Sequence, residues 1–499
     1  MSADGPDRQH LYGAVEPERD QRAALRSGRI PVAVYGLGKM GLPLAAVYAD
    51  LTGAVTGVDI DPTVVDSVNA GVCHLEGEPG LPELLETQVR AGRLEATTDG
   101  DAAARHARVH VVIVPTLITE TGDGPPEPDL STVEAVLDAI ASGLEPGDLV
   151  IVESTLPPGT CRDVIRPHLA ATSGLEADAF GVAFCPERTA SGTALRDIRG
   201  AYPKVVGGVD DESGRGAALI YDELTENAVH LVSDATTAES VKVFEGVYRD
   251  VNIALSNQLA GTAEDLGISV REVIETANHI PMCHLHDPGP GVGGHCIPYY
   301  PYFLLSRTEA PLPMVEMGRE TNRAMPTRTV SMLEREFAAN GDALAGADVL
   351  VLGFTYRPGV PEVRAAPAID IVEVLDARGA TPWGVDPLVD PGEFGARPVD
   401  LAALAAPSTG DLPSFDAAIL VTPQDGFETI DWDGLDPMTV LDGRDVLTLE
   451  DTDHRVVTLG GARAGQPLVI DAAADGDGTR DVQPSTIGRP AAFDSAQDD

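Results

Sequence analysis

The chain has 499 residues, enough for two to four domains, and 43% of them are hydrophobic, which is ample for folded cores. Its 79 acidic and 34 basic side chains give a formal net charge of −45, so we expect neither nucleic acid nor an anionic membrane as a partner. Because the acidity extends along the whole chain, we expect a halophilic protein, dissolved in concentrated salt that screens the repulsion.

The cellular compartment is predicted from two missing sequence signals and from the number of cysteines. No apolar run reaches the roughly eighteen residues that a membrane-spanning helix needs, and the first twenty residues have no signal-peptide core. Five cysteines are an odd number, which does not suit a disulfide framework and is typical of a reducing compartment. We therefore expect a cytoplasmic protein.

Lysine is rare in this chain. Only Lys39, Lys204 and Lys242 occur among the 34 basic residues, and the others are arginines. A lysine kept in such a composition indicates a site that needs a compact ammonium group with an adjustable pKa, which arginine cannot supply. Chance survival of any one of them is about as good an explanation.

In chain order, residues 1–29 are polar and charged and are predicted to be a disordered arm. Short apolar runs then alternate with helical patterns over residues 30–210, with buried strands expected at 30–38, 54–60, 108–115 and 148–155 and two more at 181–187 and 203–208. Alternation of this kind predicts parallel βαβ units.

The strand pattern fades over residues 232–337, where apolar positions at three- and four-residue steps predict one long helix from about 236 to 267. The strand pattern returns over 345–460, and residues 461–499 read as a disordered acidic tail. The fold class is therefore α/β, with two Rossmann-like doubly wound domains joined by a central domain built on a long helix. A helix of that length commonly pairs with a second subunit, so we expect a homodimer or a higher homo-oligomer.

The first motif is VAVYGLGKMGLPLA, in which Gly36, Gly38 and Gly41 have the G-x-G-x-x-G spacing directly after a strand. Such glycines form a tight turn, admit a pyrophosphate and let the next helix approach the strand. Asp59 follows the second strand, where a carboxylate binds ribose hydroxyls and repels a 2′-phosphate, so the pattern favours NAD over NADP. FAD would need further segments that the sequence lacks, and a glycine turn without a ligand is the ordinary alternative.

The second motif is PGPGVGGHCIPYYPYFL, from Pro288 to Leu304, a glycine-rich loop that carries a thiol at Cys296. Glycine lets a backbone approach a ligand closely, so this thiol suits a nucleophile that meets a substrate carbon. A buried, inert cysteine is the usual alternative. A metal site is the other, because Cys283, His284, His286, His295 and Cys296 lie close in sequence, but zinc ligands favour wider gaps, and we expect no metal.

Two further segments carry charged candidates. Glu187 in FCPERTASGT follows a strand end, where α/β proteins place ligand contacts. Lys242, Arg249 and Asn252 lie along the predicted long helix, and Lys242 and Arg249 are two turns apart on one face. A charged residue on a helix most often faces solvent, although Lys242 lies between two valines.

Taken together, GLGKMGLPLA, VPT, ESTLPPGT, CPER, the Lys242 helix, GPGVGGHC, LGFTYRP and LDGR resemble, in order, the UDP-glucose/GDP-mannose dehydrogenase family, over about residues 30–446. The CPER, YRDVNIAL and GPGVGGHC segments are most similar to the branch that oxidises UDP-N-acetylmannosamine. The resemblance implies a four-electron oxidation of the sugar C6 hydroxymethyl group to a uronate, with NAD as the hydride acceptor.

The same resemblance implies roles for individual residues. Cys296 would form the thiohemiacetal and thioester, Lys242 would stabilise the oxyanion, and Glu187 would activate the hydrolytic water. NAD would be bound by Gly36, Leu37, Gly38, Met40, Gly41, Asp59, Thr116, Thr155 and Arg364. The UDP-sugar would be bound by Glu187, Lys242, Arg249, Asn252, Gly293, His295, Tyr356 and Arg357, with Arg249 and Asn252 reaching either the sugar or a neighbouring subunit's pocket.

Two replacements depart from the family pattern. Tyr300 stands where the family usually has Asp, four residues after the cysteine, and Gly246 stands where it usually has Asn, four residues after the lysine. They leave open a second interpretation, a paralogue that binds NAD and UDP-sugar but turns over poorly. A third interpretation is the same chemistry on UDP-glucose or GDP-mannose, since motifs alone do not define the sugar pocket.

Overall fold

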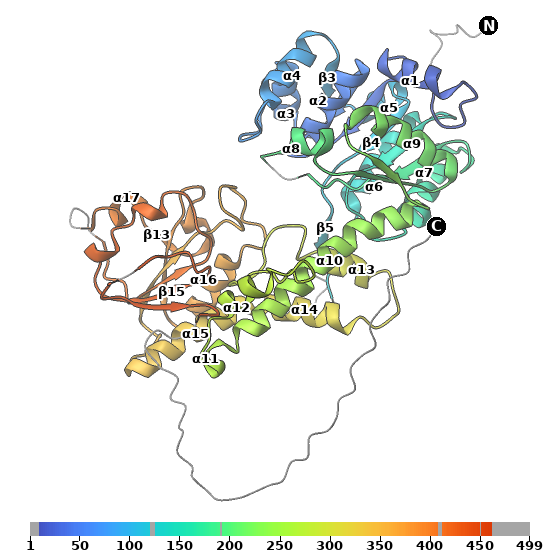
Figure 1. Ribbon diagram of the computed structural model, residues 1–499. Helices are drawn as coiled ribbons and strands as arrows, with labels where there is room; N and C mark the ends of the chain where they lie inside the picture. Colours follow the sequence, from blue (N-terminus) through green and yellow to red (C-terminus); the bar gives the residue numbers. More distant parts are fainter. Residues whose placement is uncertain (1–8, 120–124, 190–191, 408–411, 450, 462–499) are drawn as a thin grey trace, which may run out of the picture.

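The computed structural model describes residues 9–119, 125–189, 192–407, 412–449 and 451–461. Two α/β domains lie at opposite ends of the molecule, and a group of helices joins them (Figure 1). The longest of these helices, α10 (Ala235–Ala260), starts beside the N-terminal domain and extends toward the C-terminal one. No helix in the described ranges combines the length and the apolar character needed to cross a bilayer.

The N-terminal domain is built on an eight-stranded sheet in the order β10-β9-β8-β7-β4-β1-β2-β3. The order reverses at β1, which pairs in parallel with β2 on one side and β4 on the other, and this places a crevice at the carboxyl ends of these strands. The strands are β1 (Val32–Tyr35), β2 (Val55–Val58), β3 (Leu94–Thr97), β4 (Val109–Val112), β7 (Leu149–Val152), β8 (Gly181–Phe184), β9 (Lys204–Gly208) and β10 (Val229–Leu231).

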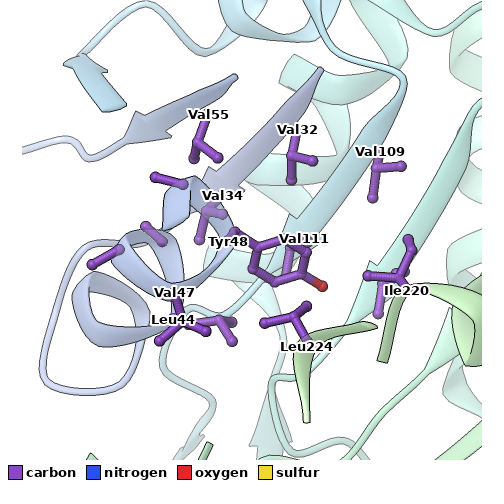
Figure 2. Packing of buried hydrophobic residues seen from close by; sticks show 14 of the residues in the cluster. Val32, Val34, Leu44, Val47, Tyr48, Val55, Val109, Val111, Ile220 and Leu224 are labelled. Atoms are coloured by element: carbon purple, nitrogen blue, oxygen red, sulfur yellow. The ribbon is translucent and has the colours of Figure 1, made fainter. Parts of the chain in front are cut away.

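Valines of β1, β2 and β4 pack against α2 and α9, with the Tyr48 ring lying between the strands and Leu224 (Figure 2). All four residues of β1 are buried, as expected of a central parallel strand covered by helices on both faces. The helices of this domain are α2 (Gly41–Thr52), α3 (Pro62–Asn69), α4 (Leu81–Arg90), α5 (Gly100–His106), α6 (Ser131–Gly143), α7 (Arg166–Ser173), α8 (Ala194–Arg196) and α9 (Asp211–Leu224), and a hairpin of β5 (Leu117–Thr119) and β6 (Glu127–Asp129) projects from it.

The end of this domain differs from the predicted boundary at residue 210. Helix α9 and strand β10 continue the same sheet to Leu231, because β10 pairs with β9. Strand β9 itself runs antiparallel to β8, so the sheet is not wholly parallel as the βαβ pattern predicted.

The predicted disordered arm over residues 1–29 is also corrected. Residues 1–8 lie outside the described ranges, but residues 9–29 include the helix α1 (Glu18–Arg26), which packs against α9. Leu11 and Leu25 are fully buried, and Arg22 donates a 2.8 Å hydrogen bond to Glu223 of α9. Charged residues dominate this segment, so the two or three apolar side chains that anchor it give little periodic signal.

The central domain is helical. Alongside α10 lies α14, and Arg319 of α14 forms a 3.0 Å ion pair with Asp250 of α10 in which both side chains are buried. The remaining helices are α11 (Ala263–Leu266), α12 (Val270–Ala277), α13 (Tyr300–Leu305), α14 (Pro313–Arg323) and α15 (Met325–Asn340).

Helix α10 ends earlier than the predicted single helix of 236–267, because the chain turns at Gly261 and starts α11 separately. Part of the predicted apolar stripe of this helix faces outward. Phe244 is 55% exposed, Leu255 and Leu259 are also exposed, and Tyr248, which was not part of the predicted stripe, is 52% exposed.

The C-terminal domain has a six-stranded sheet, all of whose paired strands are parallel, in the order β13-β12-β11-β14-β15-β16. Its elements are β11 (Asp348–Leu352), α16 (Pro367–Ala377), β12 (Thr381–Val385), β13 (Arg397–Pro398), α17 (Leu401–Leu404), β14 (Ala417–Leu420), β15 (Thr439–Asp442) and β16 (Arg455–Thr458). The order reverses at β11, so the segment after β11, residues 353–366, lies at the carboxyl edge of this sheet. The tail predicted to be disordered lies, from residue 462, outside the described ranges.

Candidate active site

The glycine turn after β1 has the geometry that a dinucleotide needs. Gly36 has φ +98°, and a Cβ there would lie 2.6 Å from the Ile113 carbonyl oxygen. A Cβ on Gly41 would lie 1.9 Å from the Gly36 carbonyl oxygen, so glycine is what lets α2 approach β1. A Cβ on Gly38 would meet no atom within 4 Å, which leaves open space for a ligand at the backbone.

Asp59 is tied to the same turn. Its Oδ2 accepts a 2.8 Å hydrogen bond from the Leu37 backbone N–H, and its Oδ1 accepts one of 3.0 Å from Asp61 N–H. Met40 precedes α2 and its sulfur accepts a hydrogen bond from Thr189, whose loop follows β8. The residues present therefore fit the adenosine and pyrophosphate parts of NAD, with a fixed carboxylate at the ribose position.

The glycines of the cysteine loop have a different use from the one the sequence suggested. A Cβ on Gly293 would lie 2.7 Å from the Tyr356 Cβ, and one on Gly289 would lie 2.5 Å from the Arg444 guanidinium. Gly294 also donates a 2.8 Å hydrogen bond to the Arg364 carbonyl. The loop is thus pressed against the C-terminal domain, and this close packing alone requires glycine.

Cys296 ends this loop next to α10 and α13, where its partly buried side chain packs with Val243 and Phe303. Hydrogen bonds from His295 and Tyr300, and the positive charges of His295 and Lys242, overcome the effect of burial and lower the pKa of the Cys296 thiol to about 7. A thiolate is therefore available near neutral pH, as a nucleophile requires.

Lys242 of α10 lies beside this thiol. Its Nζ donates a 2.5 Å hydrogen bond to the Glu187 carbonyl oxygen and lies 5.9 Å from the centre of the Tyr300 ring. Burial lowers the pKa of Lys242, although the nearby Cys296 and Glu187 oppose that effect. An ammonium group at this position can stabilise an oxyanion formed on a carbon bound to the Cys296 sulfur.

The Glu187 carboxylate has other partners than its carbonyl. It accepts a 2.6 Å hydrogen bond from Thr189 N–H, and its Oε2 lies 3.4 Å from the Lys204 Nζ. Burial would raise the pKa of Glu187, but Lys204 and these hydrogen bonds lower it to about 2. Glu187 is therefore an anion throughout the neutral range and a weak base.

Lys204 holds a second buried carboxylate. Its Nζ lies 3.1 Å from Glu153, which also accepts a 2.5 Å hydrogen bond from the Tyr221 hydroxyl. Burial, opposed by Lys204 and reinforced by Glu187, raises the pKa of Glu153 to about 7. The Lys204 ammonium thus pairs with the carboxylates of both Glu153 and Glu187, and Glu187 is the one that stays ionised.

Thr116 and Thr155 connect the N-terminal sheet to this centre. Thr116 donates a 2.8 Å hydrogen bond to the Thr155 carbonyl, and the Thr155 hydroxyl lies 3.1 Å from the Tyr300 hydroxyl. Tyr300 is buried on α13, and a Cβ added to Gly246 would lie 2.2 Å from its ring. The two residues that depart from the family pattern are therefore in direct contact.

The segment after β11 completes the site from the C-terminal domain. The Tyr356 ring lies against Gly294 and its Cβ against Gly293, and Arg357 is half-buried beside it. Arg364 is exposed, and its loop reaches the glycine turn through an ion pair of 3.3 Å between Glu362 and Lys39. The structure thus brings the predicted residues of this loop together with those around Cys296.

Arg249 and Asn252 lie elsewhere. The Asn252 amide donates a 3.0 Å hydrogen bond to His284 O and accepts one of 3.0 Å from His286 N–H, so it fixes the 284–286 loop. Arg249 is exposed on the same side of α10. Across the described ranges, no set of three or more His, Cys, Asp or Glu side chains is arranged to hold a metal ion.

Comparison with known proteins identifies this arrangement. Family models match residues 30–225 as the NAD binding domain of the UDP-glucose/GDP-mannose dehydrogenase family, 236–324 as its central domain and 350–449 as its UDP binding domain. The chain is 32% identical to the UDP-N-acetyl-D-mannosamine dehydrogenase of Pyrococcus horikoshii, over 83% of this chain and 96% of that protein. The chain belongs to the UDP-glucose/GDP-mannose dehydrogenase family.

Two further relatives agree. The chain is 33% identical to the NDP-N-acetyl-D-galactosaminuronic acid dehydrogenase of Ralstonia nicotianae, over 83% of this chain and 95% of that protein. The solved structure of the Pyrococcus horikoshii enzyme superposes with a TM-score of 0.78 at 30% identity, covering 87% of this chain and 100% of that one. The protein is therefore an NAD-dependent oxidoreductase that acts on nucleotide sugars, with two Rossmann-like domains around a central helical domain.

Sequence reasoning missed three residues of this family member's site: Glu153, Glu362 and Lys204 as a partner of Glu187. The only signal for Lys204 was the rarity of lysine in this chain, which indicates no particular role. Glu362 is an ordinary residue in a chain with 79 acidic side chains, so only its contacts in space distinguish it, whereas Glu153 begins the quoted ESTLPPGT motif and was given no role.

Proposed function

We propose that this enzyme oxidises the C6 hydroxymethyl group of a UDP-N-acetylhexosamine, UDP-N-acetyl-D-mannosamine in the first instance, to the carboxylate. The observation that carries the proposal is the pairing of Cys296 with His295 and Tyr300 next to the Lys242 ammonium, which gives a reactive thiolate beside an oxyanion-stabilising cation. The names of the relatives in Pyrococcus horikoshii and Ralstonia nicotianae support an N-acetylated sugar.

Bound NAD supplies the hydride acceptor, and two are consumed for each sugar. The Cys296 thiolate adds to the C6 aldehyde, and Lys242 stabilises the thiohemiacetal oxyanion until loss of hydride leaves a thioester. Water then cleaves the C–S bond and releases the carboxylate and the thiolate. In sum, the alcohol, water and two NAD⁺ give the acid, two NADH and two protons, so atoms, charge and electrons balance.

Glu187 has a specific part in the hydrolysis. A carboxylate with a pKa of about 2 is too weak a base to remove a proton at neutral pH. We therefore assign it to orienting the water as a hydrogen-bond acceptor, and to holding Lys242 through its carbonyl oxygen. In substrate binding, Tyr356, Arg357, Gly293 and His295, which belong to the segment after β11 and to the cysteine loop packed against it, are assigned to the UDP-sugar, while Arg364, Thr116 and Thr155 are assigned to NAD.

The decisive experiment counts NADH released per sugar at high salt, using UDP-N-acetylmannosamine, UDP-N-acetylgalactosamine, UDP-glucose and GDP-mannose. Two NADH per N-acetylhexosamine is the expected result, and Cys296→Ser should abolish the second. A preference for UDP-glucose or GDP-mannose would replace the proposed substrate, and no NADH from any of the four would contradict the proposal. One NADH per sugar would support the impaired paralogue.

The exposed face of α10 supports a homodimer. Phe244, Tyr248, Leu255 and Leu259 recur at steps of four and seven residues, so four large apolar side chains form one stripe open to solvent. We assign this stripe to a second copy of the chain, with Arg249 on its margin. Light scattering at high salt should give a dimer, and Phe244→Glu with Tyr248→Glu should give a monomer. A monomeric wild-type protein would contradict this assignment.

We further infer a halophilic, cytoplasmic protein. The net charge of −45 supports the first, and the five cysteines, all of which are unpaired, support the second because thiols persist in a reducing compartment. Activity that rises with KCl is the expected observation.

A further inference from the structure

One carboxylate joins all three domains of this enzyme. Glu362, on the segment after β11 of the C-terminal domain, has its Oε2 3.3 Å from the Nζ of Lys39 in the glycine turn. Its Oε1 lies 3.4 Å from the Nδ1 of His295 in the cysteine loop of the central domain. The Glu362 side chain is 20% exposed, against 47% for Lys39 and 47% for His295, so Glu362 is the most buried member of this contact.

His295 lies between this carboxylate and the nucleophile. One side of its ring meets Glu362, and its side chain also interacts with the thiol of Cys296, the next residue in the chain. The backbone supports the same arrangement, because Gly294 N–H bonds to Arg364 O and Tyr356 N–H bonds to Glu362 O. The loop that carries the thiol and the segment that carries Glu362 are thus held in register by main-chain contacts.

From these contacts we propose that Glu362 is a positioning residue that holds His295 as an imidazolium beside the Cys296 sulfur, so that a carboxylate of the C-terminal domain activates the nucleophile of the central domain. The inference rests on the proposed function in giving Cys296 the role of nucleophile. The arrangement follows the general logic of a nucleophile, a base and a group that orients the base.

The protonation states of the groups around the Cys296 thiol agree with a chain of contacts from Glu362 through His295 to Cys296. Hydrogen bonds to Cys296 and Glu362 raise the pKa of His295 to about 9, whereas the pKa of Glu362 is lowered to about 2, chiefly by His295 and also by Lys39. Between pH of about 7 and about 9, imidazolium and thiolate therefore coexist. The other groups facing the thiol are Lys242 of α10, Tyr300 of α13 and Tyr356 after β11.

The sign of a Glu362→Gln effect separates two roles for this residue. If Glu362 acted on Cys296 only through space, removal of its negative charge would lower the pKa of the thiol. If it acts through His295, its removal lowers the pKa of the imidazolium, and the thiol loses its cationic partner. The pKa of Cys296 then rises instead.

The test is the rate of Cys296 alkylation by iodoacetamide from a pH of about 5 to about 10, followed by mass spectrometry of the Cys296 peptide in the full chain at high salt. We expect a wild-type midpoint near 7. For Glu362→Gln the midpoint should rise by about one pH unit, so that alkylation at a pH of about 6 slows roughly tenfold. His295→Gln should raise it at least as far, and Glu362→Gln should add no further rise in that background.

Glu393→Gln, an exposed glutamate of the same domain, is the matched control and should leave the midpoint unchanged. The proposal would be overturned if the alkylation midpoint of Glu362→Gln fell or stayed at the wild-type value. It would also be overturned if Glu362→Gln raised the midpoint equally in the wild-type protein and in His295→Gln. The readout needs no turnover. If no nucleotide sugar yields NADH while the midpoint still rises, the proposed function fails and the role of Glu362 stands.

Discussion

At the scale of single residues, Tyr300 and Gly246 form a matched pair. The Tyr300 ring occupies the space in which a side chain at position 246 would lie, its hydroxyl contacts Thr155, and it also helps to lower the pKa of the Cys296 thiol. A polar side chain at position 246 could not coexist with this ring. The two departures from the family pattern are therefore one coupled change, which keeps a hydrogen-bond donor at the thiol.

Substitution of Gly246 by alanine should show this coupling. With its Cβ 2.2 Å from the Tyr300 ring, Gly246→Ala should lower the free energy of unfolding by about 1–3 kcal/mol and reduce kcat, because the ring must move away from the thiol. Chemical denaturation and the NADH assay measure the two effects.

Gly216→Ala, in α9, is the control, since its Cβ would meet nothing closer than 3.4 Å and should stabilise the helix. Gly246→Asn combined with Tyr300→Asp should recover more stability than Gly246→Asn alone. Equal stability of these two variants would contradict the coupling.

The pH dependence of kcat/KM follows from two groups. Cys296 must be a thiolate, and its pKa of about 7 makes the rate rise with pH through that value. Lys242 must be charged, and burial lowers its pKa, so the rate should fall in alkaline solution before an ordinary lysine would lose its proton. A bell-shaped profile is expected, and Lys242→Arg should move its alkaline limb upward. A profile flat from pH of about 6 to about 8 would contradict the assignment of Cys296.

Whether a residue of the site could be predicted from the sequence depended on how rare its amino-acid type is in this chain. Three lysines in 499 residues are conspicuous, and the structure gives each one a carboxylate or carbonyl partner around the site: Glu362, Glu153 with Glu187, and the Glu187 carbonyl. Glutamates carry no such signal in an acidic chain. Within one chain the Asn252 amide holds the 284–286 loop, and its predicted contact with the sugar or with a neighbouring subunit's pocket stays a prediction.

At the scale of elements, a buried polar network joins α10, α14 and the cysteine loop. Arg319 pairs with Asp250, Asn322 donates to Asp250 at 2.9 Å, Asn257 donates to Asn322 at 2.9 Å, and Gly289 N–H donates to Asn257 at 2.9 Å. The loop that ends at Cys296 is therefore anchored to the helix pair through its first glycine.

Removal of one charge from this network should be costly. Arg319→Met leaves Asp250 buried without its cation, so we expect a loss of about 3–5 kcal/mol in the free energy of unfolding. Arg319→Met together with Asp250→Leu should recover much of that loss, because no buried charge remains. The exposed Arg328→Met is the control and should be nearly neutral. A loss in the double variant as large as in the single one would argue against a charge effect.

The sequence predicted the long apolar strands well and the short or polar ones poorly. β1, β7 and β14 are continuous apolar runs, and β4 and β11 depart from this only at His110 and Asp348, which is close to what a central parallel strand requires. Strand β3 reads Leu-Glu-Ala-Thr and β13 has only two residues, so neither gives a pattern; both lie at sheet edges. The cysteine loop was predicted to be glycine-rich for a ligand, whereas its glycines are explained by contact with Tyr356 and Arg444.

At the scale of the whole molecule, the net charge of −45 dominates. Repulsion of this size destabilises the folded state in dilute buffer, because the screening length falls from roughly 10 Å at about 0.1 M salt to roughly 3 Å at about 1 M. The thermal midpoint should therefore rise with KCl and level off above about 1 M. Differential scanning calorimetry measures it, with sucrose as a control that strengthens burial without screening. An equal rise in sucrose, or none in KCl, would contradict the electrostatic explanation.

Scarcity of lysine gives this protein a built-in set of spectroscopic reporters. Selective ¹³C enrichment at lysine Cε should yield three resonances, one from the Glu362 contact between domains, one from the pair of interior carboxylates and one from the ammonium next to the sulfur. Titration with dinucleotide, nucleotide sugar or acid could then be followed at three separate points of the catalytic machinery at once, in a chain of this size and without any mutation.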